Sequence, residues 1–125
     1  MSKAIGMVEY RTVSTGVQAA DIMLKTSSVD ILESSVVCPG KYIVIITGDL
    51  SAVKAAVDAS KTRFSAELID SFVLGNPDDA IFSAIYGATE VKDVKALGIL
   101  ETFSAASIIV AADAAAKTSQ VELIE

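Results

Sequence analysis

Apolar and polar positions along the chain follow two periods, and these predict a mixed order of strands and helices. Continuous or alternating apolar runs rich in β-branched residues indicate strands, whereas apolar residues at helical spacing, as at Val17, Ala20 and Leu24, indicate a helix. The expected strands cover 4–13, 29–37, 41–47 and 68–74, and the expected helices cover 15–25, 51–61 and 76–86. This order predicts an α/β (α+β) domain of ferredoxin-like βαββαβ type, with helices on one face of an antiparallel sheet.

The chain also repeats itself. Residues 3–33 align without a gap onto residues 95–125, at an offset of 92. The pairs that are identical at this offset include Glu9 and Glu101, Asp21 and Asp113, and Lys25 and Lys117. We therefore expect one complete domain over residues 1–92 and a partial second copy over residues 93–125 that supplies only βαβ. The recurrence of these charged residues favours a scaffold or interface role, because both copies of a duplicated frame need the residues that fold or assemble it.

The partial copy raises the question of what covers its helix. In a complete unit, further strands would pack against that helix and bury its apolar face. The predicted helix must therefore pack against the first unit, against another chain, or against sequence outside these 125 residues.

Composition narrows the classes of function. Hydrophobic residues make up 52% of the 125 residues, which is too many for a disordered chain. Histidine is absent and Cys38 is the only cysteine, so His-based acid–base catalysis, an intrachain disulfide and a Cys/His metal cage within one chain are excluded. One thiol and an N-terminus without the pattern of a cleavable signal predict a reducing, cytoplasmic setting.

Charge and hydropathy argue against two kinds of partner. The net charge is −6, and the ten Lys and Arg residues are scattered singly, so we expect no nucleic acid partner. The apolar runs are far shorter than a bilayer is thick, and we expect no membrane partner. Glycine-rich nucleotide motifs are absent as well, and the S-x-x-K pattern at 51–54 reads as a helix start rather than as an acyl-transfer motif.

Cys38 lies between two predicted strands, in a loop that reads VVCPGKYIV. Pro39 and Gly40 are the pair that suits the two central positions of a type II turn. A lone cysteine is most often a small buried hydrophobe, but a place at a turn, with Lys41 closing it, also suits a reactive or metal-bound thiolate. One thiolate cannot hold a cluster. A closed ring of three chains would bring together three of the four thiolates that a 4Fe-4S cluster usually takes.

A family resemblance adds to these observations. The segments that carry it are KAIGMVEYRTVSTGVQAADIMLKTSSVDILE, the CPGK loop, YIVIITGDLSAVKAAVDA, IDSFVLGNP and KALGILETFSAASIIVAADAAAKTS, and together they cover nearly the whole chain. In these segments the sequence resembles bacterial microcompartment shell proteins of the tandem-domain, trimeric class. Members of that class carry a complete second domain, whereas the match here ends part-way through it.

The resemblance implies a structural protein rather than an enzyme. It implies a flat tile of a cytoplasmic bacterial microcompartment shell, in which a homotrimer imitates a hexamer and packs beside other shell proteins. By the same resemblance the central pore is lined by Val37, Cys38, Pro39, Gly40 and Lys41. Cys38 would be a metal ligand of a 4Fe-4S cluster that three chains share and that carries electrons. Lys25 and Lys117 would contact neighbouring tiles at the edges; from the sequence alone, Lys25 equally fits a cation that interacts with the C-terminal dipole of its helix.

Two other functions fit parts of the sequence. The order of elements alone permits a ferredoxin-like regulatory module that binds a small metabolite between subunits. A thiol redox enzyme that uses Cys38 would need a resolving cysteine, which the chain does not contain. Assembly separates the first alternative from a shell tile, because a tile forms sheets whereas a sensor stays a discrete oligomer.

Overall fold

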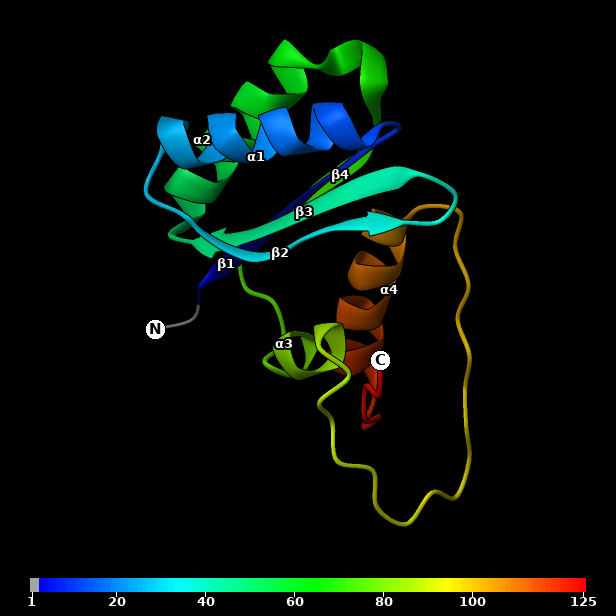
Figure 1. Cartoon of the computed structure of the whole chain (residues 1–125). Coiled ribbons are helices and arrows are strands. Elements are labelled where there is room, and N and C mark those ends of the chain that lie inside the picture. Colours follow the sequence, from blue (N-terminus) through cyan, green and yellow to red (C-terminus); the bar gives the residue numbers. More distant parts are fainter. Residues whose placement is uncertain (1–2) are drawn as a thin grey trace.

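A computed structural model of the chain describes residues 3–125; Met1 and Ser2, with which the predicted first domain begins, lie outside the described residues. The fold is a four-stranded antiparallel sheet between two layers of helices (Figure 1). The elements are β1 (Ala4–Tyr10), α1 (Val13–Thr26), β2 (Asp30–Val37), β3 (Lys41–Gly48), α2 (Leu50–Arg63), the 3-10 turn η1 (Ser65–Glu67), β4 (Leu68–Leu74), α3 (Ala80–Ile85) and α4 (Ala105–Thr118).

Strand β1 lies at the centre of the sheet, whose order is β2-β3-β1-β4. It pairs antiparallel with β3 on one side and with β4 on the other, so its Glu9 stands opposite Ile43 and opposite Asp70. This is the order and direction of strands in a ferredoxin-like βαββαβ unit, and the predicted fold class is confirmed. The predicted first strand is too long, because Thr12 caps α1 and the strand ends at Tyr10.

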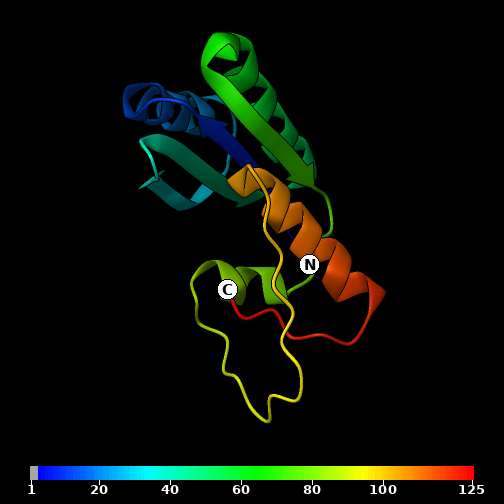
Figure 2. The same ribbon diagram turned by 90° about the vertical axis from the view of Figure 1, so that its right-hand side faces the viewer.

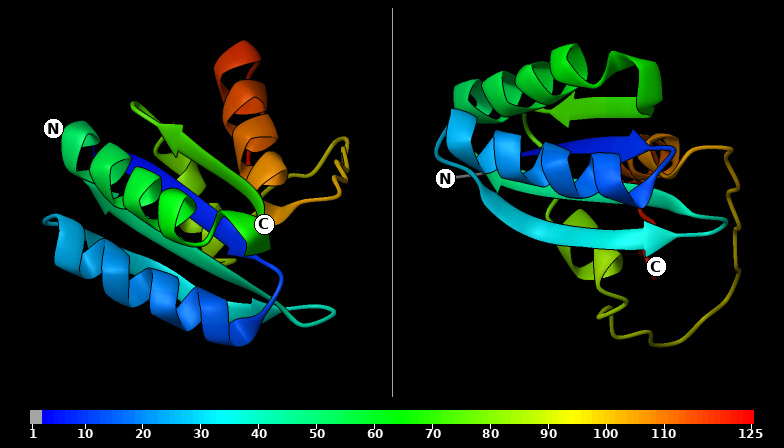
Figure 3. Two further views of the ribbon diagram at one scale, coloured as in Figure 1. Left: turned by 90° about the horizontal axis from the view of Figure 1, so that it is seen from above. Right: turned by 45° about the horizontal axis from the view of Figure 1, so that its top comes forward.

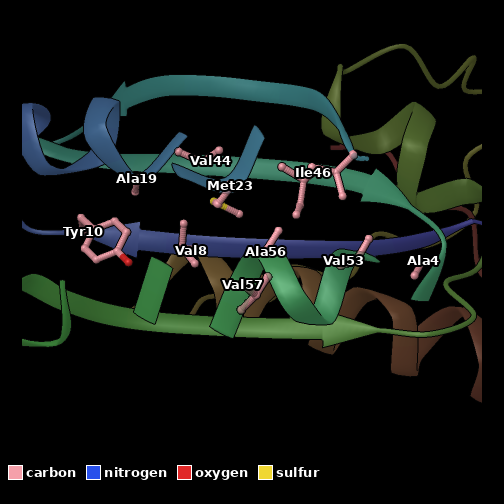
Figure 4. Packing of buried hydrophobic residues seen from close by; sticks show 11 residues of the cluster. Ala4, Val8, Tyr10, Ala19, Met23, Val44, Ile46, Val53, Ala56 and Val57 are labelled. Atoms are coloured by element: carbon pink, nitrogen blue, oxygen red, sulfur yellow. The ribbon is translucent and has the colours of Figure 1, made fainter. Parts of the chain in front are cut away.

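Helices α1 and α2 cover one face of the sheet, as the sequence predicted for the first unit (Figure 3). Figure 4 shows the core between these layers, where Val8 and Tyr10 of β1 meet Ala19 and Met23 of α1. All four of these side chains are fully buried. The alternation of β1 sends Ala4, Gly6, Val8 and Tyr10 to this face and Ile5, Met7 and Glu9 to the other.

Gly6 allows α2 to approach the sheet closely. A Cβ atom at this position would lie 2.6 Å from Cγ1 of Val53 and 2.9 Å from Cγ2 of Val57. Distances this short leave no room for a methyl group, so the glycine sets the spacing between β1 and α2. Gly98, its counterpart in the repeat, has nothing within 4 Å of such an atom.

The opposite face of the sheet is covered by α3 and by α4, the helix of the partial copy (Figure 2). Ile5 and Met7 of β1 are fully buried there, and Ala106 of α4 packs against them at 1% exposure. Of the three neighbours that the sequence allowed, the first unit is therefore the one that covers the α4 helix. The two long helices of the first unit share one face as predicted, and the helix of the copy takes the other.

Of the βαβ expected from the partial copy, only the helix forms. Residues 96–102, which repeat β1, run as an extended segment without strand pairing, and residues 121–125 form no strand either. The segment leaves Leu97, Ile99 and Leu100 exposed, and Figure 1 shows it running apart from the sheet. The reason is physical: a strand gains its hydrogen bonds from neighbouring strands, and within residues 3–125 the copy has no counterparts of β3 and β4, the strands that pair with β1.

The short helix after β4 is also shorter than the predicted 76–86. The chain turns at Pro77 first, and Asp78 Oδ1 accepts a hydrogen bond from the Ala80 N–H at 2.9 Å. Helix α3 then runs over Ala80–Ile85, and Gly87 follows with a positive φ of 59°. None of the helices within residues 3–125 is both long and apolar enough to cross a membrane.

Candidate functional site

The five predicted pore-loop residues form the corner between β2 and β3. Val37 ends β2, Lys41 begins β3, and the Gly40 N–H donates to the Val37 carbonyl at 3.0 Å. The Cys38–Pro39 peptide bond is cis, which makes this a type VI turn with Pro39 at its second central position. The predicted type II turn is therefore wrong: the turn lies one residue earlier. Gly40 has a φ of 118°, which a residue with a side chain rarely adopts.

The Cys38 side chain is exposed at this corner. The interpretation as a small buried hydrophobe does not hold, because the turn carries the thiol away from both cores. Within residues 3–125, no three Cys, His, Asp or Glu side chains gather in a way that could hold a metal ion. A single chain therefore offers one accessible sulfur ligand at its surface, and a cluster would need ligands from further chains.

Lys41, expected to favour the Cys38 thiolate, is instead engaged by a buried carboxylate. Its Nζ lies 2.7 Å from Oε2 of Glu9, which is fully buried on the inner strand β1. The other carboxylate oxygen, Oε1, accepts the backbone N–H of Ala106 at 3.2 Å. Ala106 is in the first turn of α4, where backbone N–H groups have no partner inside the helix. Glu9 thus joins the corner of the hairpin to the N-terminus of α4.

A second carboxylate holds the same helix end. Asp70 on β4 stands directly opposite Glu9 in the sheet. Its Oδ2 accepts hydrogen bonds from the hydroxyl of Ser104 at 2.5 Å and from that of Ser107 at 3.1 Å. Ser104 is the N-cap of α4, and its Oγ accepts the Ser107 N–H at 3.1 Å. Two negative charges on neighbouring strands therefore face the positive end of the α4 dipole.

The pKa of Asp70 reflects this role. The hydrogen bond from the Ser104 hydroxyl makes the largest contribution and lowers the pKa of this carboxyl group below its ordinary 3.8. Desolvation opposes the shift, while the Ser71 N–H, the Ser107 hydroxyl and the charge of Lys61 add to it. The ionised form of Asp70 is thus the form that binds α4.

The two predicted edge lysines lie on opposite layers of the molecule. Lys25 on α1 pairs with Asp21 at 2.8 Å and is well exposed. Lys117 on α4 pairs with Asp113 at 2.7 Å and also donates to the Asn76 carbonyl at 2.7 Å. Asp113 is 5% exposed, and its Oδ1 accepts the Asp78 N–H at 2.7 Å. In the copy, the repeated Asp–Lys pair therefore holds the loop that follows β4.

An open hollow of about 320 Å³ lies beside the hairpin corner. Cys38 and Lys41 line one side, and residues 100–105 with Ile108 of α4 line the other. The hollow is open to solvent, so its walls would not surround a small molecule.

Sequence reasoning placed the hairpin corner but missed the carboxylates that hold α4. The recurrence of Glu9 as Glu101 was a usable signal that this carboxylate matters to the repeat. No signal in the sequence pointed to Asp70, since its place opposite Glu9 depends on the pairing register of β1 with β4.

Comparisons with known proteins agree with the repeat. The family model described as "BMC domain" matches residues 4–77 and again residues 96–125. The bacterial microcompartment shell protein PduT of Citrobacter freundii is 40% identical over 99% of this chain and 67% of its own length. The bacterial microcompartment shell protein EutK of Escherichia coli is 35% identical over 63% of this chain and 49% of its own length.

A solved structure gives the same result for the fold. A crystal structure described as a microcompartment protein from Desulfitobacterium hafniense DCB superposes with a TM-score of 0.85 at 51% sequence identity. The superposition covers 98% of this chain and 68% of that one. The chain thus spans about two thirds of the length of PduT and of the Desulfitobacterium protein. The arrangement of α4 against the sheet lies within the part that superposes.

Proposed function

Because the chain belongs to the BMC-domain family of bacterial microcompartment shell proteins, we propose that it is a structural tile of such a shell and not an enzyme. The observation that carries the proposal is the double match of the family model to one chain, with the helix of the second copy docked on the sheet of the first. A place in a microcompartment shell follows from the family. The domain division at residues 92 and 93 remains a prediction.

The tile that we propose is a homotrimer that imitates a hexamer and packs beside other shell proteins. Two units in each chain allow three chains to occupy six positions of a ring. The turn from Val37 to Lys41 would line the central pore, because it is an exposed corner fixed to the sheet by the buried Glu9. Lys25 and Lys117 would contact neighbouring tiles; the exposure of Lys25 supports this more directly than the internal contacts of Lys117.

Assembly tests this proposal directly. The purified chain should form flat sheets or tubes when concentrated, visible by negative-stain electron microscopy, and should be incorporated into shells when it is co-expressed with other shell proteins. A regulatory module that binds a metabolite should stay a discrete oligomer and gain thermal stability from its ligand. A discrete particle that never enters a shell would refute the tile.

We further propose that Cys38 is a ligand of a 4Fe-4S cluster shared by three chains. An exposed thiol that belongs to no group of three or more potential ligands within residues 3–125 fits a site completed by symmetry mates better than a site within one chain. Such a cluster would supply one-electron transfer through the shell. What the chain itself contributes is a rigid corner that presents the sulfur, since Gly40 and the Lys41–Glu9 pair fix both its conformation and its attachment.

Reconstitution tests the cluster separately from the tile. Anaerobic incubation with iron and sulfide should give a brown protein with a thiolate-to-iron absorption band and an electron paramagnetic resonance signal after reduction. The variant Cys38→Ser should lose both signals and still assemble. A colourless wild-type protein that forms intact trimers would refute the cluster and leave the tile standing, whereas failure of Cys38→Ser to assemble would show that the thiol packs in the assembly.

A further inference from the structure

Helices α1, α2 and α4 are equally long but are held to the sheet in different ways. Each has 14 residues. Helix α1 buries Ala19 and Met23 completely, and α2 does the same with Val53. In α4 the buried residues are Ala106 and Asp113, which contribute a methyl group and a carboxylate. Burial of apolar surface therefore contributes less to the attachment of α4 than to that of the other two helices.

The apolar contact of α4 with the underside of the sheet is made mostly by alanines. Ala105, Ala106 and Ala112 pack, together with Ile109, against the core on that face. Alanine side chains remove little apolar surface from water when they dock. The helix therefore depends on other interactions to stay in place.

Polar contacts at the N-terminus supply part of this attachment. Glu9 of β1 accepts the Ala106 N–H, and Asp70 of β4 accepts the hydroxyl groups of Ser104 and Ser107. Each of these bonds joins a strand of the sheet to the first turn of α4 or to its N-cap. The sheet thus holds the start of the helix through two carboxylates.

A third carboxylate holds the far half of the helix. Asp113 Oδ1 accepts the Asp78 N–H at 2.7 Å, and Asp113 Oδ2 pairs with Lys117 at 2.7 Å. Lys117 also donates to the Asn76 carbonyl. Asn76 and Asp78 lie in the loop after β4, so this half of α4 is tied to the first unit by one carboxylate and its lysine.

The segment that leads into α4 adds little to this attachment. Within residues 3–125, no backbone hydrogen bond joins residues 89–101 to the rest of the chain, and the ion pair of Lys92 with Glu90 stays inside the segment. The four strands of the sheet all lie within residues 4–74, and the core between the sheet and α1 and α2 uses no residue beyond Val73. Undocking α4 therefore breaks no strand pairing and leaves that core intact.

We propose that residues 100–125, with α4 at their centre, form a strap that opens from the sheet as one unit while the first unit stays folded. The proposal does not depend on the proposed tile, because the contacts that it concerns lie inside one chain. An isolated helix of 14 residues is marginal in water, so α4 loses helical structure when it leaves the sheet. Opening is therefore a local unfolding step, and its free energy lies below that of unfolding the whole chain.

Opening of the strap changes two surfaces at once. It exposes Ile5 and Met7, which are fully buried on the face that the docked helix covers (Figure 2). It also removes the wall that residues 100–105 and Ile108 form opposite Cys38 in the hollow beside the hairpin corner. The strap thus controls both access to the apolar underside of the sheet and the surroundings of the thiol.

Hydrogen exchange followed by mass spectrometry measures the opening in the wild-type chain. The repeat supplies the internal standard, because residues 108–118 of α4 match residues 16–26 of α1 at the offset of 92. In dilute protein at neutral pH, the amides of 108–118 should exchange at least about tenfold faster than those of 16–26, after correction for intrinsic rates. Low concentrations of urea should accelerate exchange less in α4 than in α1, because local opening exposes less surface than global unfolding.

Matched charge variants test what holds the strap. Asp113→Asn should accelerate the exchange of residues 108–118 about tenfold, because Lys117 and the Asp78 N–H lose their ionised partner. The control Asp21→Asn removes the counterpart charge from α1, where the side chain is 59% exposed, and should change the exchange of either helix by less than about twofold.

A variant at the other end of the strap separates undocking from a local change in the helix. Asp70→Asn alters β4 and leaves the sequence of α4 unchanged, yet it should accelerate the exchange of residues 108–118 about as much as Asp113→Asn does. The exchange of residues 16–26, measured in the same samples, shows that each variant keeps the fold of the first unit.

The outcomes decide the proposal without reference to assembly. Equal exchange of the two helices with the same urea dependence would show that α4 opens only when the whole chain unfolds, and would overturn the strap. Faster exchange of α4 that neither Asp113→Asn nor Asp70→Asn changes would overturn it as well, because the helix would then open while it stays docked. Faster exchange that both variants accelerate, with Asp21→Asn without effect, supports the strap, and a failure of the tile to assemble leaves each of these results as it is.

Discussion

The buried carboxylate of Glu9 should contribute strongly to stability, and replacing it with glutamine measures that contribution. Glu9→Gln keeps the size of the side chain and one oxygen that can accept the Ala106 N–H. It removes the charge that pairs with Lys41 at 2.7 Å and places an amide donor next to an ammonium donor. The perturbation is therefore confined to one ion pair, of which the carboxylate is fully buried.

The magnitude follows from the burial of the two partners. Removing one member of a buried ion pair typically costs about 3–5 kcal/mol, because the other charge remains without compensation. Lys41 is not fully buried: its side chain is 22% exposed, so it can turn partly toward water. We therefore expect Glu9→Gln to lower the free energy of unfolding by about 2–3 kcal/mol, below the usual range for a completely buried pair.

Urea unfolding at neutral pH, followed by circular dichroism, measures this loss. The midpoint should fall while the slope with denaturant stays unchanged. The repeat supplies the control: Glu101→Gln changes the same residue at the exposed counterpart, and at low protein concentration it should alter stability by less than about 0.5 kcal/mol. A double-mutant cycle with Lys41→Met should give a coupling energy above about 1 kcal/mol. Equal stability of the two glutamine variants would show that the Glu9–Lys41–Ala106 link is not formed.

Two further predictions concern Gly6, compared with its counterpart Gly98 in the repeat, and Asp70, which binds the N-terminus of α4. Gly6→Ala should lower the free energy of unfolding by about 1–3 kcal/mol, because the new Cβ would lie 2.6 Å from Val53 Cγ1. The control Gly98→Ala, whose Cβ would have nothing within 4 Å, should leave the thermal melting curve unchanged. Equal effects of the two substitutions would contradict the close approach of α2. The hydrogen bond from Ser104 lowers the pKa of Asp70, so the stability that ionised Asp70 contributes should be complete at pH values above the ordinary pKa of 3.8 and should be lost as the pH falls through the lowered pKa. Asp70→Asn should therefore make stability depend less steeply on pH at the acid end of a stability-against-pH curve. An unchanged acid limb would contradict the assigned hydrogen bonds.

Local signals were sufficient for most of the first unit. The strands over 29–37, 41–47 and 68–74 were predicted close to their observed bounds, because apolar, often β-branched runs between turn residues are what a buried strand requires. The class of the fold followed from the order of these elements. The type of turn at Pro39 could not be predicted in this way, because it depends on whether the Cys38–Pro39 peptide bond is cis or trans, and the residue types allow both.

The second copy shows where sequence reasoning fails. Residues 96–102 have nearly the pattern of β1, yet they are extended and unpaired, because the state of a strand depends on whether neighbours offer hydrogen bonds. Helix α4 forms regardless of this, because its backbone hydrogen bonds are internal and Ser104 caps it. Of the two carboxylates that dock α4, Asp70 could not be predicted, since it reaches the helix end only through the register of β4.

The repeat explains why apolar side chains are exposed on α1 and on residues 96–102. A helix that served only its own sheet would need one apolar stripe, and its outer side would gain solubility from polar residues. Helix α1 instead exposes Val17 and Leu24, and the extended segment exposes Leu97 and Ile99. In α4 the stripe that matches the outer side of α1 is packed against a sheet and the other side is open. Each face of the repeated helix is thus buried in one copy, which explains why the helix carries apolar residues on both faces.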